Sequence, residues 1–281
     1  AARVVMEATG RYSPEMAAWL LRLRPAWAPA IIQPKLAHDF IKSVGLRNRT
    51  NRLVARCLAY YGVERRPAAY QPPQPQYPQL RELVRFRRQL VEEHTAQANQ
   101  AGEPAQSSFV RREHSRRLKQ SQRHIARVEA ETRAFLAKHP QVQRDVALLM
   151  SIDGIGPIVS LTLLAELGDL RRFASGRQLV AFTGLNPSNV HSGQSVHSPA
   201  HLFRGGNRHA RHILYLAAMA AIRKANGFQQ FYLRLLEKHP EHPVVALGAV
   251  MRKLLLVART VLVHGVPFDP HSLSCGEPVT T

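Results

Sequence analysis

A proline-rich segment, QPPQPQYPQ at residues 71–79, divides this chain of 281 residues into two unequal parts. Repeated prolines remove backbone hydrogen-bond donors and block helix formation, and such a composition is typical of a linker. The chain is long enough for two domains that each bury a hydrophobic core. We therefore expect separately folded parts on the two sides of this linker.

Residues 1–70, before the linker, alternate short apolar runs with helical patterns. The apolar runs are RVVME and APAIIQ, and the helical patterns lie around residues 16–23 and 51–61. Strands that alternate with helices in this way indicate an α/β domain.

Residues 80–140, after the linker, are highly charged and helical in pattern. Apolar residues recur at helical spacing in two stretches, around Leu83 and around Val128, and the sequence AGEP at residues 101–104 separates them. This arrangement predicts a long helical hairpin or coiled coil, whose many arginines are more often a solvated face than a binding surface. Residues 141–281 form a further part that we expect to be compact and mostly helical. The predicted fold class is thus α/β plus mainly α.

The charge balance limits the possible partners. Lysine and arginine number 39 against 19 aspartate and glutamate residues, a formal net charge of +20. Nucleic acid is the usual partner of such an excess. A membrane surface is the alternative, but the longest apolar run, VVALGAVMRKLLLVARTVLV, is interrupted by Arg252, Lys253 and Arg259, so we expect no membrane span.

The chain contains two cysteines, Cys57 and Cys275, and its opening residues show no secretory signal. Two cysteines make neither a disulfide framework nor a zinc site. We therefore expect a protein of the reducing cytoplasm.

Two local signals in the last part suggest contacts with nucleic acid. Gly154 and Gly156 precede a long apolar helix, and backbone N–H groups at a helix start can bind phosphate, although a plain tight turn between packed helices is the alternative. Further on, the cationic residues Arg204, Arg208 and Arg211 precede or open another apolar helix. Cations at a helix start beside a serine-rich loop suit a DNA backbone.

That loop, AFTGLNPSNVHSGQSVHS, contains Ser192, Ser195 and Ser198 as candidate nucleophiles, with His191 and His197 close in sequence. It lacks the G-x-S-x-G pattern of a serine hydrolase. The histidines match no standard metal spacing, so solvent-exposed or phosphate-contacting histidine is the simpler interpretation.

A third stretch, GLRNRTNRLVARCLAYYG at residues 45–62, runs from a polar segment into a helix that Asn51 can cap. Asn51 and Val54 stand three residues apart on its first turn, so they project side by side toward whatever lies over the helix start. A valine is unexpected at so polar an end.

Five segments resemble, in order, the transposases of the insertion-sequence 110/116/902 family, whose relatives include RNA-guided recombinases. They are MEATGRY, GLRNRTNRLVARCLA, IDGIGPIVSLTLLAELGD, RQLVAFTGLNPSNVHSGQS and GAVMRKLLLVARTVLVHGVPFD. The resemblance covers nearly all of the chain.

The resemblance implies an RNase H-like (RuvC-like) domain whose four acidic residues hold Mg²⁺, and a C-terminal domain whose serine attacks a DNA phosphate. By position, Glu7 matches the acidic ligand of the family's E-A-T-G motif, and Ser192 matches the nucleophile. Asn51 and Val54 stand where the family has two aspartates. DNA, a structured guide RNA and further copies of the chain are the implied partners.

These replacements leave two functions open. The chain is either a transposase or recombinase of this family, or a non-catalytic remnant that still binds RNA or DNA. Hard Mg²⁺ prefers charged oxygen ligands, and Val54 offers no donor atom, so we expect impaired catalysis and doubtful metal binding. The sequence also starts six residues before Glu7, which suggests a shortened N-terminal domain, although a fragment of a longer product would look the same.

Overall fold

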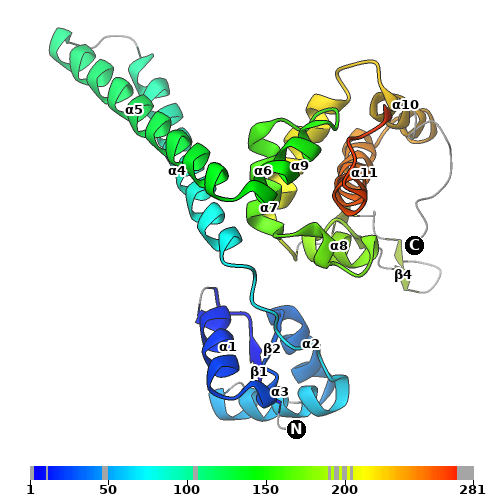
Figure 1. Cartoon of the computed structure of the whole chain (residues 1–281). Coiled ribbons are helices and arrows are strands. Elements are labelled where there is room, and N and C mark those ends of the chain that lie inside the picture. Colours follow the sequence, from blue (N-terminus) through cyan, green and yellow to red (C-terminus); the bar gives the residue numbers. More distant parts are fainter. Residues whose placement is uncertain are drawn as a thin grey trace. The chain divides into compact units, whose positions relative to one another are not determined.

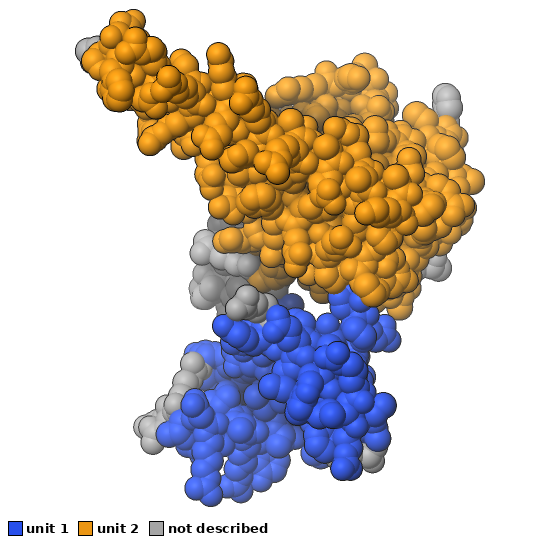
Figure 2. All heavy atoms as spheres, turned by 60° about the vertical axis from the view of Figure 1, so that its left-hand side comes forward, with its two compact units in different colours: residues 1–73 blue, residues 74–281 orange. Residues whose placement is uncertain are grey.

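The computed structural model describes residues 3–10, 12–45, 50–103, 107–188, 191–192, 196–197, 201–202 and 205–270, with the backbone alone for those between 187 and 202. The chain forms two compact units, residues 1–73 and 74–281 (Figure 2). The boundary between them falls inside the proline-rich segment 71–79.

The first unit is a small α/β arrangement (Figure 1). Its elements are β1 (Val5–Glu7), α1 (Tyr12–Leu23), the 3-10 helix η1 (Pro25–Trp27), β2 (Ala30–Ile32), α2 (Pro34–Ser43) and α3 (Asn51–Arg65). Strands β1 and β2 pair in parallel, with Val5 opposite Ala30 and Glu7 opposite Ile32. Both strands fall inside the apolar runs that predicted them, while an RNase H-like fold stays a prediction.

The core of this unit lies between the two strands and the helices. Leu20 of α1, Ile32 of β2, Phe40 and Ile41 of α2 and Cys57 of α3 are buried. The Phe40 ring also meets the Tyr61 ring edge-on, with 5.2 Å between the ring centres, so α2 and α3 pack directly against each other. This packing holds the start of α2 and the start of α3 close to the end of β1.

A helical hairpin opens the second unit. It consists of α4 (Gln76–Ala101) and α5 (Ser108–Lys138), which lie side by side in Figure 1. Leu80 and Leu90 of α4 and Val128 and Phe135 of α5 are buried. Polar contacts join the helices as well, including an ion pair of 2.8 Å between Arg87 and Glu129.

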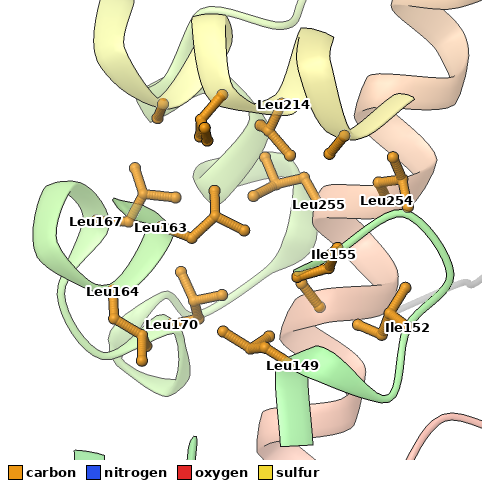
Figure 3. Packing of buried hydrophobic residues seen from close by; sticks show 14 of the residues in the cluster. Leu149, Ile152, Ile155, Leu163, Leu164, Leu167, Leu170, Leu214, Leu254 and Leu255 are labelled. Atoms are coloured by element: carbon orange, nitrogen blue, oxygen red, sulfur yellow. The ribbon is translucent and has the colours of Figure 1, made fainter. Parts of the chain in front are cut away.

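The remaining elements of the second unit are mostly helices, as predicted. They are α6 (Pro140–Met150), α7 (Pro157–Leu167), the 3-10 helix η2 (Leu170–Arg172), α8 (Gly176–Thr183), α9 (Arg208–Ala221), α10 (Gly227–Lys238) and α11 (Pro243–His264), with four short strands between α8 and α9. Leucine and isoleucine side chains from α6, α7, α9 and α11 fill the space between these helices (Figure 3). No helix of the described residues is long and apolar enough to span a lipid bilayer.

A buried ion pair joins three elements of this core. Asp145 of α6 is fully buried, and its carboxylate accepts hydrogen bonds of 2.5 and 3.1 Å from the guanidinium of Arg171 in η2. Arg171 also donates to Asp169 at 2.8 Å and to the Leu262 carbonyl of α11 at 3.4 Å. Burial, followed by the nearby charges of Asp169 and Asp145, raises the pKa of the adjacent Tyr77 to about 12.

Removing this cation should weaken the second unit. We expect Arg171→Gln to lower its free energy of unfolding by about 3 kcal/mol, because the Asp145 carboxylate would stay buried without its charged partner. Urea unfolding followed by circular dichroism measures the change. Arg177→Gln, on the exposed face of α8, is the matched control and should cost less than about 0.5 kcal/mol. Equal losses in the two variants would contradict a structural role of the Asp145–Arg171 pair.

Candidate functional site

An open pocket in the first unit brings together residues from three elements, β1, α2 and α3. Its volume is about 510 Å³, and it is lined by Glu7, Pro34, Lys35, His38, Asp39, Ile41 and Val54. Two of the residues that the sequence singled out, Glu7 and Val54, therefore line the same pocket. Asn51 is exposed and is not among the lining residues.

Parallel strand pairing explains why these residues meet. Glu7 ends β1 and lies opposite Ile32, which ends β2, and α2 begins two residues later at Pro34. The carboxyl ends of parallel strands lie at one edge of the sheet, where α/β proteins gather their functional residues. The structure adds Asp39 to these residues, and the sequence did not single it out because it lies inside α2 rather than directly after a strand.

The start of α3 differs from the prediction in one detail. Thr50, not Asn51, caps this helix: the Thr50 side chain accepts a hydrogen bond of 3.3 Å from the Leu53 backbone N–H. Both residue types are good caps, and the helix begins one residue earlier than an Asn51 cap requires. Asn51 is thus the first helical residue, and Val54, three residues later, lines the pocket.

The charges around this pocket do not suit a bound Mg²⁺. Glu7 and Asp39 supply carboxylates, but Lys35 adds a positive charge, and the nitrogen Nδ1 of His38 lies 3.5 Å from the Asp39 carboxylate. Across the described residues, no three His, Cys, Asp or Glu side chains form a group that could hold a metal ion. Mg²⁺ requires hard oxygen ligands in near-octahedral arrangement, and Val54 supplies none.

The loop that contains Ser192 forms two short strand pairs. Strand β3 (Pro187–Ser188) pairs with β6 (His201–Leu202), and β4 (His191–Ser192) pairs with β5 (Val196–His197), both antiparallel. Ser192 lies opposite Val196, near the end of this double hairpin. Ser195, Ser198 and Arg204 lie outside the described residues.

The base of this serine loop, residues 184–207, is closed by a tight backbone contact. Gly184 has a φ of +73° and Gly206 a φ of +85°, and a Cβ added at Gly206 would lie 2.6 Å from the Gly184 nitrogen. Arg211, one turn into α9, donates to the carbonyl oxygens of Thr183 and Gly205 and so joins the two ends of the loop. The structure gives this predicted cation a role inside the protein, whereas Arg208 at the start of α9 is exposed.

A buried carboxylate holds the second end of the loop. Glu166 of α7, whose side chain is 1% exposed, accepts hydrogen bonds of 2.7 and 2.8 Å from the Arg85 guanidinium of α4. It also accepts a hydrogen bond of 2.9 Å from the Asn207 side chain. The Asn207 oxygen in turn accepts from the backbone N–H groups of His209 and Ala210, each at 3.0 Å, and so caps α9.

The protonation states of this network follow from its geometry. Burial alone would raise the pKa of Glu166, but the hydrogen bonds from Arg85 and Asn207 outweigh it and hold the pKa below its usual value. Burial lowers the pKa of His209, and the nearby Arg88 lowers it further. Nitrogen Nδ1 of His209 lies 2.5 Å from the Arg88 guanidinium, which can only donate, so His209 accepts there as a neutral imidazole.

Gly154 and Gly156 precede α7 and differ in their surroundings. Gly154 has a φ of +85°, and a Cβ there would lie 2.6 Å from the Ala217 carbonyl oxygen of α9. Gly156 caps α7, and nothing lies within 4 Å of the position of its missing Cβ. Close packing on α9 accounts for Gly154, and phosphate binding by the two glycines stays a prediction.

The low pKa of Glu166 predicts how stability depends on pH. The ionised form is stabilised in the folded protein, so its contribution is complete above the unfolded pKa of about 4.3 and is lost as the pH falls through the lower folded pKa. We expect Glu166→Gln to cost about 2 kcal/mol of unfolding free energy near pH 7, and this deficit to shrink as the pH falls toward about 3. Urea unfolding of the unmodified chain and of Glu166→Gln over this pH range measures the deficit in unfolding free energy.

Glu237→Gln, an exposed change on α10, is the control and should show no such pH-dependent deficit. A deficit for Glu166→Gln that stays constant down to acid pH would mean that the carboxylate charge is not what holds the loop base.

Comparison with known proteins identifies the family. A sequence model described as a transposase of the DEDD type in IS110 elements matches residues 1–110, and that of the transposase IS116/IS110/IS902 family matches residues 146–233. The pilin gene-inverting protein of Moraxella bovis is 28% identical over 271 residues, which cover 95% of this chain and 81% of that protein, and its Moraxella lacunata counterpart aligns equally well. A probable family 20 transposase of Pseudomonas aeruginosa is 30% identical over 54% of this chain and 45% of its own length. The chain belongs to the IS116/IS110/IS902 family of transposases.

Proposed function

We propose that the chain binds DNA as a transposase or recombinase of an insertion element, and that in its present sequence it does not carry out Mg²⁺-dependent strand cleavage. The Moraxella relatives are named for inverting a pilin gene, an action on DNA, and they align with almost the whole chain. The net charge of +20 supports a polyanionic partner. A structured guide RNA and further copies of the chain are the other proposed partners.

One observation carries the catalytic half of the proposal. Glu7 lines a pocket in which Val54, rather than a carboxylate, faces it from α3 and Lys35 adds a positive charge. Lys35 opposes a cation electrostatically, and Val54 cannot coordinate one. Glu7 and Asp39 alone leave most of a metal's coordination sphere to water.

Ser192 is the proposed nucleophile, because it matches the family serine and lies in a loop held at its base by Arg211 and Asn207. The backbone hydrogen bonds of β4 and β5 fix the position of this residue in the loop. An anchored loop can present one side chain to a DNA phosphate. The same anchoring would hold the loop against DNA in a chain that binds without cleaving.

DNA binding should depend steeply on salt. Lysine and arginine that neutralise phosphates release counterions, so we expect the affinity for a DNA duplex to fall about 10³-fold between about 50 and about 200 mM salt. Fluorescence anisotropy with a labelled duplex measures this. A neutral osmolyte at matched osmolality is the control, and a flat response to salt would contradict nucleic-acid binding.

Restoring a carboxylate should restore metal affinity. We expect Val54→Asp to raise the affinity for Mn²⁺, a paramagnetic substitute for Mg²⁺, at least about tenfold, because a third carboxylate would join Glu7 and Asp39 at the pocket. Titration followed by electron paramagnetic resonance measures free Mn²⁺. Val63→Asp adds the same charge at a position of α3 that is 76% exposed, and it should leave the affinity unchanged.

Two results would contradict this account. Equal Mn²⁺ affinities in the Val54→Asp and Val63→Asp variants would mean that the pocket is not a metal position even when a third carboxylate is present. Covalent trapping of DNA on Ser192 by the unmodified chain with Mg²⁺ would show that cleavage survives.

A further inference from the structure

The exposed face of α5 is unusual in its charge. Ser121, Val128, Thr132 and Phe135 of this helix are buried, and they mark the face that packs in the hairpin. With 3.6 residues per turn, the opposite face is occupied by residues spaced three or four apart from position 112 to position 127. Five cations recur on that face at this spacing, and all five are exposed: Arg112, Arg116, Lys119, Arg123 and Arg127.

These five residues, the cationic row, are almost uncompensated. In residues 108–127 the only acidic residue is Glu113, which pairs with Arg116 at 2.7 Å. No ion pair joins the other four members of the row to an acidic side chain of the described residues. A solvated helix face usually mixes both signs of charge, and like charges three or four residues apart destabilise a helix by a few tenths of a kcal/mol per pair.

The row has the dimensions of a backbone contact. Fifteen residues of α-helix separate Arg112 from Arg127, a rise of about 22 Å, which matches roughly six base pairs of a duplex. At its outer end lies an open hollow of about 480 Å³, lined by Ser108, Arg111, Arg112, Ser115, Arg116 and Lys119. Hydroxyl and guanidinium groups are the side-chain donors that proteins most often offer to phosphate oxygens.

The position of the row keeps it accessible. Its outer part lies toward the end of the hairpin that extends away from α6–α11 (Figure 1). The hairpin is in turn fixed at its other end, where Arg81 and Arg85 of α4 donate to Ala165 and Glu166 of α7. A helical arm that is anchored at one end can lay its cationic row along a long polyanion.

We propose that the cationic row of α5 binds the sugar–phosphate backbone of double-helical nucleic acid. This inference rests on the proposed function, and it adds where on the chain the partner lies. Because phosphates carry no sequence information, the row contributes affinity and orientation but no choice of sequence. DNA and a helical segment of RNA offer the same phosphates, so the test includes both.

The test compares two double variants of α5. Lys119→Gln with Arg123→Gln removes one lysine and one arginine from the row. Arg117→Gln with Lys138→Gln removes the same two charges from exposed positions of the same helix that lie off the row. Glutamine has nearly the helix propensity of lysine and arginine, so both variants should keep the hairpin folded, which circular dichroism verifies.

We expect the row variant to bind a DNA duplex, an RNA duplex or both roughly tenfold more weakly near physiological salt, with a salt slope shallower by about 1.8 for B-DNA, since two phosphate contacts are lost. The off-row variant should bind within about twofold of the unmodified chain. Weakening on one duplex alone would support the row and identify the nucleic acid that occupies it.

Equal effects of the two variants, while the unmodified chain binds with a steep salt slope, would contradict nucleic-acid binding by the row. The proposed function would still stand. A change of oligomeric state in the row variant, with nucleic-acid affinity unchanged, would contradict nucleic-acid binding by the row as well and assign the row to contacts between copies. An unmodified chain that binds neither duplex would overturn the proposed function itself.

Discussion

The buried Glu166 carboxylate is the interaction on which the second unit depends most. A carboxylate with a 1% exposed side chain must be paired and hydrogen-bonded, since its desolvation is otherwise very costly. Its partners come from α4 and from the residue that caps α9, so one group joins the hairpin, the core helix α7 and the second end of the serine loop. Any displacement of the hairpin base therefore disturbs the loop base through the same carboxylate, and both features stay in fixed relation within this unit.

The fold was largely predictable where local chemistry decides it. Prolines at 71–79 marked the boundary because they remove donors whatever the tertiary context, and apolar runs marked β1 and β2 because short strands need them. The hairpin was visible in its helical spacing. The cap of α3 was missed by one residue, since Thr50 and Asn51 are both suitable caps and only the backbone conformation distinguishes them.

The site was less predictable, because it depends on contacts between distant residues. Glu166 sits in the apolar sequence SLTLLAELGDL, where a lone acid reads as the polar edge of a helix, and its partner Arg85 is 81 positions away. Arg211 was expected to face DNA, whereas it donates to the backbone at the loop base. Asp39 was not singled out, because it lies in the second turn of α2 and only the fold brings that turn to the pocket beside Glu7.

The two units of this chain present different chemical groups. The first places Glu7 at the end of a strand, in a pocket that Lys35 and Val54 also line, and this mixture of side chains does not favour a divalent cation. The second keeps an anchored loop and a surplus of cations, properties that act on phosphates without a metal. Under the proposed function, a valine in place of an aspartate at position 54 removes one carboxylate from this pocket, whereas the loop base is held by contacts of its own. On that proposal, DNA binding and cleavage depend on different parts of the chain, so binding can persist where cleavage does not occur.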